Sequence, residues 1–366
     1  MARFEGALAR ASARHGLLGD AHAQAISRAC ADAHFDATAL ARAGRAGTLA
    51  IPFVEQLMAH VAATSPEAAR HVHAGATSQD VIDTAVVLCL KPACARVLDL
   101  AGRAGDAAAA LSRRHAQTPT AARTLLQPAL PVPFGWKAAV WVSMLARCVA
   151  GLRGAASGAC VLQFGGPSGT LAAFGERGAA LAASLAQELD LPPSLVPWHS
   201  ARDSFARLGA ELAILAGAAG KIGRDVALLM QREVGEASEG KAAGRGGSSS
   251  MPHKRNPALS MLALEAAQRA PGLAATLLGQ LTPEHERGLG QWQSQWFTLR
   301  ELACAAASGT AAIADVLEGL EVDEQAMRGN LEALLKDHAH DSFGAAGAMI
   351  ESSLAEWAAV KRGTAP

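Results

Sequence analysis

The segment at residues 203–235 constrains the fold more than any other part of the chain, because it contains no proline and repeats apolar residues at helical spacing. The repeat consists of Phe205, Leu208, Leu212, Leu215, Ala219, Ile222, Val226 and Leu229. Alternating steps of three and four residues place one apolar stripe on a single helix face, which indicates packing against other helices in a bundle. A fully helical segment of this length would span about 50 Å.

Four other segments have the same alanine-rich, proline-poor composition, and alternation of β-branched residues is almost absent from the chain. They are residues 93–117, 133–159, 258–280 and 291–320. Pro133 suits the first turn of its helix, whereas Pro271 is expected to kink the helix that contains it. We therefore predict an all-α fold built around five long helices.

The charge balance excludes one large class of function. The chain has 33 Lys and Arg residues against 33 Asp and Glu residues, with a pI near 7.2. A nucleic-acid-binding protein needs a basic excess for its phosphate partner, so we expect no nucleic-acid partner. Hydrophobic residues make up 50% of the chain, which excludes intrinsic disorder and provides a sizeable core.

The six cysteines are scattered and form no CxxC pair, as is typical of a protein in a reducing compartment. No uninterrupted apolar run reaches membrane-spanning length, and the N-terminal residues have no apolar stretch typical of a signal peptide. An Arg-rich, amphipathic start leaves an organelle transit segment as an alternative, although Glu5 argues against it. We expect a cytoplasmic protein without a membrane partner.

Three loops differ in composition from the alanine-rich background: residues 118–133, 163–170 and 235–257. In the last of these, three glycines and three serines precede Lys254 and Arg255, so this stretch is a poor helix former that ends in positive charge. A serine-bearing loop beside fixed cations suits an anionic substrate and negative charge that develops during a reaction. A flexible linker between helices is the alternative interpretation.

Residues 247–257, GSSSMPHKRNP, resemble the GSSxMPxKxNP signature of the fumarase/aspartase superfamily. Two further regions of that superfamily occur in the expected order, HAGATSQD at residues 73–80 and RTLLQP at residues 123–128. The resemblance implies a long-helix bundle core with a small helical N-terminal domain. It also implies a homotetramer in which regions from different subunits together form each active site.

The same resemblance implies roles for individual residues. Ser249 is expected to be catalytic, exchanging a proton at the carbon next to a substrate carboxylate, and it would need Lys254, backbone donors and loop closure to lower its pKa. The expected substrate-binding residues are His73, Thr77, Ser78, Thr124, Gln127, Lys254 and Asn256. For His73, a structural hydrogen bond is an equal alternative. His285 and Glu286 either lie near the site or cap a helix, and no metal or organic cofactor is implied.

Two departures from the superfamily pattern bear on the reaction. Most members carry His where this chain has Leu125 and Glu where it has Met261, and in those members the two act as a pair. Expelling an amine needs a proton donor, whereas a carboxylate, with a reference pKa of about 4, leaves or attacks without one. The missing pair therefore favours the 3-carboxy-cis,cis-muconate cycloisomerase branch, in which a carboxylate of a small tricarboxylate substrate closes a lactone. The run EHERGLGQWQSQW at residues 284–296 also resembles that branch.

Two alternatives remain open. One is a C–N lyase of the adenylosuccinate lyase type, and the other is a degenerate, non-catalytic homologue. The non-catalytic alternative is suggested by the C-terminal region. Its resemblance to the superfamily implies that much of the third domain is missing. We expect an N-terminal helical domain at residues 1–92, a central bundle at 93–325 and a shortened, truncated C-terminal segment at 326–366.

Overall fold

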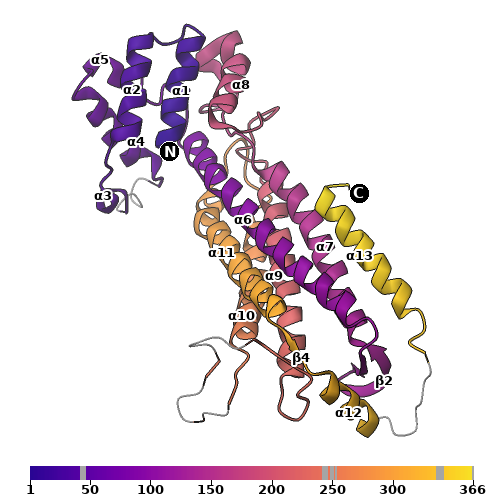
Figure 1. The fold of residues 1–366 in the computed structure, drawn as a ribbon. Coiled ribbons are helices and arrows are strands. Elements are labelled where there is room, and N and C mark those ends of the chain that lie inside the picture. The colour runs from indigo at the N-terminus through magenta and orange to yellow at the C-terminus, as the bar shows by residue number, and fades with distance from the viewer. Residues whose placement is uncertain (42–46, 241–245, 248–250, 252–253, 335–341, 365–366) are drawn as a thin grey trace. The chain divides into compact units, whose positions relative to one another are not determined.

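The computed structural model describes the chain except for residues 42–46, 241–245, 248–250, 252–253, 335–341 and 365–366. Figure 1 labels its helices and strands. Its contacts divide the chain into two compact units. The first unit comprises residues 1–93, 156–206 and 278–297, and the second comprises residues 94–155, 207–277 and 298–366. Helix α6 (Ser78–Arg114) runs through both units. The division into three domains stays a prediction.

The first unit is built mainly from short helices. They are α1 (Ala2–Arg14), α2 (Asp20–Asp32), α3 (Ala37–Ala41), α4 (Ala50–Ala62), α5 (Pro66–Ala69), the 3-10 helix η2 (Ala172–Arg177) and α8 (Gly178–Leu189). Helix α1 packs against both α2 and α8, and Phe4 and Leu8 of α1 are buried. The N-terminal helical character predicted from the sequence is confirmed.

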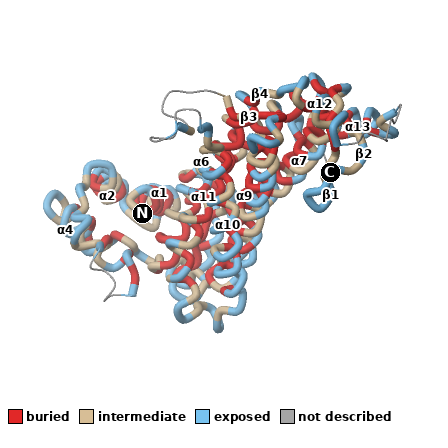
Figure 2. The backbone as a smooth tube through the Cα atoms, turned by 90° about the horizontal axis from the view of Figure 1, so that it is seen from below, coloured by how far each residue is buried: buried red, intermediate tan, exposed pale blue. Residues whose placement is uncertain are grey.

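The second unit contains the long helices and two short helices near the C-terminus. They are the second part of α6, most of α7 (Phe134–Ala159), α9 (Asp203–Leu229), α10 (Ala258–Leu278) and α11 (Gln291–Glu318), and all of α12 (Glu324–Leu334) and α13 (Ala346–Arg362). Every residue of the predicted apolar stripe on α9 is buried, so the bundle interpretation is confirmed. In Figure 2, buried residues, drawn in red, recur along the tubes of α7, α9 and α11. Close approach of α9 to α10 requires the small residues Gly220 and Gly223, where a side chain would meet Ala267 or the backbone of Ser260.

Helix bounds differ from the predicted ones at one important place. The predicted helix at 93–117 begins instead at Ser78 and continues through Pro92. Thr77 precedes the first helical residue, and its backbone N–H donates to the Asp80 carboxylate at 3.0 Å, an N-terminal capping arrangement. Because this cap fixes the start of the helix, the proline lies in its interior.

The proline-rich loop at residues 118–133 is a β-hairpin, which the sequence analysis missed. Strand β1 (Pro119–Thr124) pairs with antiparallel β2 (Gln127–Pro133), with an irregularity between Ala121 and Arg123. Leu125 and Leu126 connect the strands with left-handed φ values of 52° and 65°, as a two-residue type I′ turn requires. A second short ladder joins β3 (Ala237–Ser238) to β4 (Glu321–Val322).

Among the described residues, one helix is long and apolar enough to cross a membrane by length and composition alone. It is α7, and half of its most apolar window is buried. Trp141 and Leu145 on this helix are almost completely inaccessible to water. The core helix of a bundle has the same features, so this is weak evidence for a membrane span.

Candidate active site

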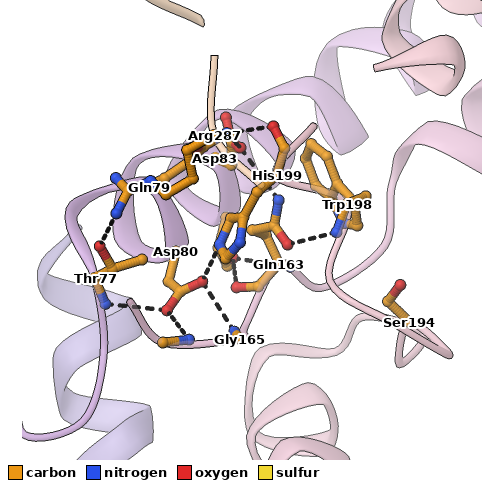
Figure 3. Close-up of polar contacts among 12 residues, drawn as sticks. Thr77, Gln79, Asp80, Asp83, Gln163, Gly165, Ser194, Trp198, His199 and Arg287 are labelled. Carbon is orange, nitrogen blue, oxygen red and sulfur yellow. Dashed lines mark hydrogen bonds and ion pairs between the residues drawn. The ribbon is translucent and has the colours of Figure 1, made fainter. Parts of the chain in front are cut away.

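Asp80 ties the start of α6 to two other segments of the first unit (Figure 3). Its fully buried carboxylate accepts hydrogen bonds from the backbone N–H groups of Thr77, Gly165 and Gly166 at 2.8–3.0 Å. It also lies 2.7 Å from Nε2 of His199. A buried carboxylate with this many donors has its charge compensated, and it locks the backbone around Thr77 and Ser78.

Asp83 is the centre of a second buried cluster one turn further along α6. Its carboxylate accepts hydrogen bonds from both terminal nitrogens of Arg202, at 2.7 and 3.2 Å, and from the indole N–H of Trp292 at 2.9 Å. The side-chain amides of Gln79 and Gln163 complete the set. The Arg202 guanidinium also lies against two neighbouring rings, 4.8 Å from the centroid of Trp198 and 4.9 Å from that of Phe205. This cluster joins segments that are far apart in the sequence into one rigid support for the Thr77 region.

Arg287 is a cationic residue of this region that the sequence analysis did not select. Its guanidinium donates to the hydroxyl of Thr77 at 2.6 Å. The residue belongs to the EHER run at 284–287, which had been noted only as a family resemblance. Its position beside Thr77 adds the positive charge that binding of a carboxylate needs and that His73, Thr77 and Ser78 alone supply poorly.

His73 is held by the buried carboxylate of Glu5 on α1. Its ring Nδ1 donates to Oε1 of Glu5 at 2.7 Å, and its backbone N–H donates to Oε2 at 3.1 Å. Burial alone would lower the pKa of His73, but the hydrogen bond and charge of Glu5, assisted by Asp80, leave that pKa raised above its ordinary value of 6.5. The cationic imidazolium is therefore more stable, relative to the neutral ring, than in a free histidine. The structural hydrogen bond considered for His73 is present, and it is compatible with a role in binding.

In the second unit, Thr124 and Gln127 are the paired residues on either side of the hairpin turn. Both are exposed. The hairpin is anchored by Arg123, the residue before Thr124, which forms two hydrogen bonds, of 2.9 and 2.6 Å, with the buried carboxylate of Glu236. Thr120 and Asn330 donate to the same carboxylate. The exposed tip of the hairpin is therefore held in place through strand β1.

The loop that carries the GSSSMPHKRNP motif, residues 247–257, also belongs to the second unit. Ser249 lies outside the described residues. Of the other predicted residues of this loop, Lys254 is exposed, and Asn256 donates its backbone N–H to the carbonyl of Gly246 at 2.8 Å. Glu239 fixes the start of α10 by accepting the backbone N–H groups of Leu259 and Ser260. The residues that flank the loop are thus held in place.

The predicted site residues fall into separate groups. The structure brings His73, Thr77 and Ser78 into one region of the first unit, joined by Arg287. It places Thr124 and Gln127 at a hairpin tip and Lys254 and Asn256 beside α10, both in the second unit. Among the described residues, no hydrogen bond joins the hairpin pair to Lys254 or Asn256.

Comparison with known proteins identifies the family. A family model described as lyase matches residues 1–272. The chain belongs to the lyase family. The fumarase/aspartase membership predicted from the three motifs is therefore confirmed.

This lyase-family chain resembles proteins with cycloisomerase and lyase activities. It is 51% identical over 334 residues to a 3-carboxy-cis,cis-muconate cycloisomerase of Bradyrhizobium diazoefficiens, which covers 91% of this chain and 74% of the relative. It is 41% identical over 342 residues to a nitrosuccinate lyase of Streptomyces davaonensis. That match covers 91% of this chain and 72% of the relative.

Among solved structures, the lyase-family chain is similar to the 3-carboxy-cis,cis-muconate lactonizing enzyme of Pseudomonas putida. The TM-score is 0.91 at 34% sequence identity, and the match covers 99% of this chain and 94% of that one. The predicted all-α fold class is confirmed by this match and by the helices described above.

Proposed function

We propose that the chain is an intramolecular lyase that closes 3-carboxy-cis,cis-muconate to 4-carboxymuconolactone, in the protocatechuate branch of aromatic degradation. The observation that carries the proposal is the 51% identity to a cycloisomerase over 91% of the chain. The apolar side chains at positions 125 and 261 also support it. Leu125 is 97% exposed and Met261 is 56% exposed, so both can face a substrate. Neither can donate or accept a proton.

The chemistry of ring closure fits such a site. One carboxylate of the substrate attacks an alkene carbon of the same molecule, forming a C–O bond, while the electron pair of the double bond moves toward the carbon next to a second carboxylate. The attacking group is already an anion at neutral pH, so it needs no base. Holding it near the accepting carbon supplies much of the rate. The enolate-like charge on the second carboxylate must be stabilised by cations and hydrogen-bond donors.

Ser249 is the proposed donor of the proton that completes the reaction at carbon, and it removes this proton in the reverse direction. Its hydroxyl would need the neighbouring Lys254 ammonium to make proton exchange feasible. No hydrogen bond or ion pair of the Lys254 side chain occurs within the described part of the chain, which leaves the ammonium available for this task and for a substrate carboxylate.

The remaining residues are proposed to bind the substrate's carboxylates. In the first unit these are His73, Thr77 and Ser78, with Arg287 beside Thr77. In the second unit they are Thr124, Gln127, Lys254 and Asn256. All of them offer N–H or O–H donors, as a small tricarboxylate substrate requires.

We also propose that the protein works as a cytoplasmic homotetramer whose active sites are shared between subunits. Several large apolar side chains on its long helices are exposed in the single chain, which supports contact with further copies. They include Val140 on α7, Ile214 on α9, Met261 and Leu262 on α10, and Phe297 on α11.

Loss of the conjugated diene absorbance of 3-carboxy-cis,cis-muconate tests the reaction directly. Purified protein is expected to remove the absorbance with formation of one lactone, and Ser249→Ala is expected to slow turnover by roughly a hundredfold or more. An unchanged diene would contradict the assigned reaction. Full activity of Ser249→Ala would leave the reaction intact and contradict only the role of the serine.

A second candidate is elimination from nitrosuccinate, favoured by the 41% identity to a nitrosuccinate lyase. Such an elimination would expel nitrite, a weakly basic anion that also leaves without a proton donor. Leu125 and Met261 argue against adenylosuccinate but do not separate these two reactions. Assaying muconate, nitrosuccinate and adenylosuccinate in parallel separates the three, and inactivity on all of them would favour the non-catalytic homologue.

A further inference from the structure

Glu5 has an unusual position for a residue in the first turn of the N-terminal helix. It is 2% exposed, and both oxygens of its carboxylate bind the same residue, His73. A buried carboxylate is costly unless it is paired, so its position indicates that the contact with His73 compensates its charge.

His73 itself has a backbone conformation that needs support. Its φ of 60° lies in the left-handed region, which is unfavourable for a residue with a side chain. The hydrogen bond from its backbone N–H to Glu5 holds this conformation, while the bond from Nδ1 fixes the direction of the ring. A single carboxylate thus controls both the backbone and the side chain of His73.

The free side of the imidazole remains available. With Nδ1 bound to Glu5, a cationic ring carries its second N–H at Nε2, and among the described residues Nε2 has no hydrogen-bonding partner. Glu5 and His73 line a cavity of about 190 Å³, together with His71 and Phe174. The titratable groups around the ring are Glu5 from α1, Asp80 from α6 and His71 from the same turn as His73.

We propose that Glu5 is a positioning residue of the active site: its carboxylate orients His73 through Nδ1 and leaves Nε2–H as a donor to a substrate carboxylate. This assignment rests on the proposed function, in which His73 binds substrate. Glu5 itself touches neither the substrate nor the reacting atoms.

The central test compares Glu5→Gln with the wild-type enzyme. The substitution keeps the size of the side chain but removes its charge, so kcat/KM for the muconate is expected to fall roughly tenfold, mainly through KM. The limb of the pH profile that reports His73 is expected to move to lower pH. Glu67→Gln, the same change at an exposed carboxylate of the same unit, serves as the matched control and should leave both unchanged.

A second measurement reads the contact between the two residues without any substrate. Hydrogen–deuterium exchange at Cε1 of histidines, followed by mass spectrometry across pH, gives the titration of each ring separately. The His73 titration in the wild-type enzyme is expected above the ordinary histidine pKa of 6.5, and Glu5→Gln should shift it downward. This result is independent of turnover, so it stands even if the assigned reaction fails.

A double-mutant comparison separates positioning from general support of the fold. If Glu5 acts through His73, Glu5→Gln should have little further effect on kcat/KM in a His73→Gln background. An equal loss in both backgrounds, or a His73 titration that Glu5→Gln does not move, would overturn the proposal.

Discussion

At the scale of single residues, buried carboxylates organise each unit. Asp80 and Asp83 in the first unit and Glu236 and Glu239 in the second are almost inaccessible to water, and each accepts several hydrogen bonds. For Asp80, Asp83 and Glu236 the donors come from more than one segment of the chain, whereas Glu239 binds the start of α10. These carboxylates therefore fix the loops and helix ends that carry the candidate site residues.

Asp83 provides the sharpest stability prediction. Asp83→Asn keeps the shape but removes the charge that compensates buried Arg202, so we expect a loss of at least about 3 kcal/mol in the free energy of unfolding. Asp190→Asn weakens the exposed pair with Lys91 and should cost far less, because solvent screens that pair. Urea unfolding measures both. Equal effects of the two substitutions would contradict the view that the Asp83 charge compensates buried Arg202.

His115 gives a prediction about pH. Burial lowers its pKa below the ordinary value of 6.5, despite the nearby Glu324 carboxylate. Its folded pKa lies below its unfolded pKa, so its contribution to stability is full above about pH 6.5 and is lost as pH falls toward the folded pKa. His115→Gln should therefore flatten the decline in unfolding free energy below pH 6.5. Urea unfolding at several pH values measures this decline, and an equally steep decline in His115→Gln would contradict the role of His115.

At the scale of elements, small residues decide how closely helices approach. Gly105 on α6 lies under the ring of Trp357 on α13, and a methyl group there would overlap that ring. Trp357 also donates its indole N–H to Asp106 at 2.9 Å. Together these contacts seat the last helix of the chain on α6.

A pair of alanine substitutions on the same helix tests this contact. Gly105→Ala must displace Trp357 and should lower the unfolding free energy by about 1–3 kcal/mol. Gly102→Ala meets open space and should raise it by about 0.5–1 kcal/mol, because alanine is the better helix former. Urea unfolding, with tryptophan fluorescence as a second signal, measures both. A gain in stability for Gly105→Ala would contradict the seating of α13 by Trp357.

At the scale of the whole molecule, the predicted site residues are divided between two units, and the proposed tetramer gives a way for them to meet. If sites are shared, mixing two inactive variants should restore activity. For Ser249→Ala mixed with Arg287→Gln in equal amounts and reassembled, about a quarter of the sites would receive both intact regions when the regions come from different subunits.

The controls for this mixing experiment are each variant reassembled alone, which should stay inactive. Sites formed within one chain would always carry one of the two lesions, so absence of any recovery in mixed tetramers would contradict shared sites. Size-exclusion chromatography with light scattering gives the number of subunits and tests the tetramer separately.

The sequence by itself determined the family and the bundle. A regular apolar repeat on α9 has one physical solution, burial of the stripe against other helices, and the GSSSMPHKRNP run is long enough to identify the superfamily. Substrate-binding candidates came from the same motifs. In each of these cases the information is local, carried by spacing or by a contiguous run of residues.

Only the tertiary structure decided the pairing of groups that lie far apart in the chain. Nothing in the residues near Glu5 indicates His73, and nothing near Thr77 indicates Arg287, yet both pairs form hydrogen bonds. The hairpin at 118–133 was missed because its prolines and its Leu125–Leu126 turn are poor local signals for strands. Such contacts depend on which segments packing brings together, because a buried charge must pair with a group that is near it in the fold, whatever their separation in the sequence.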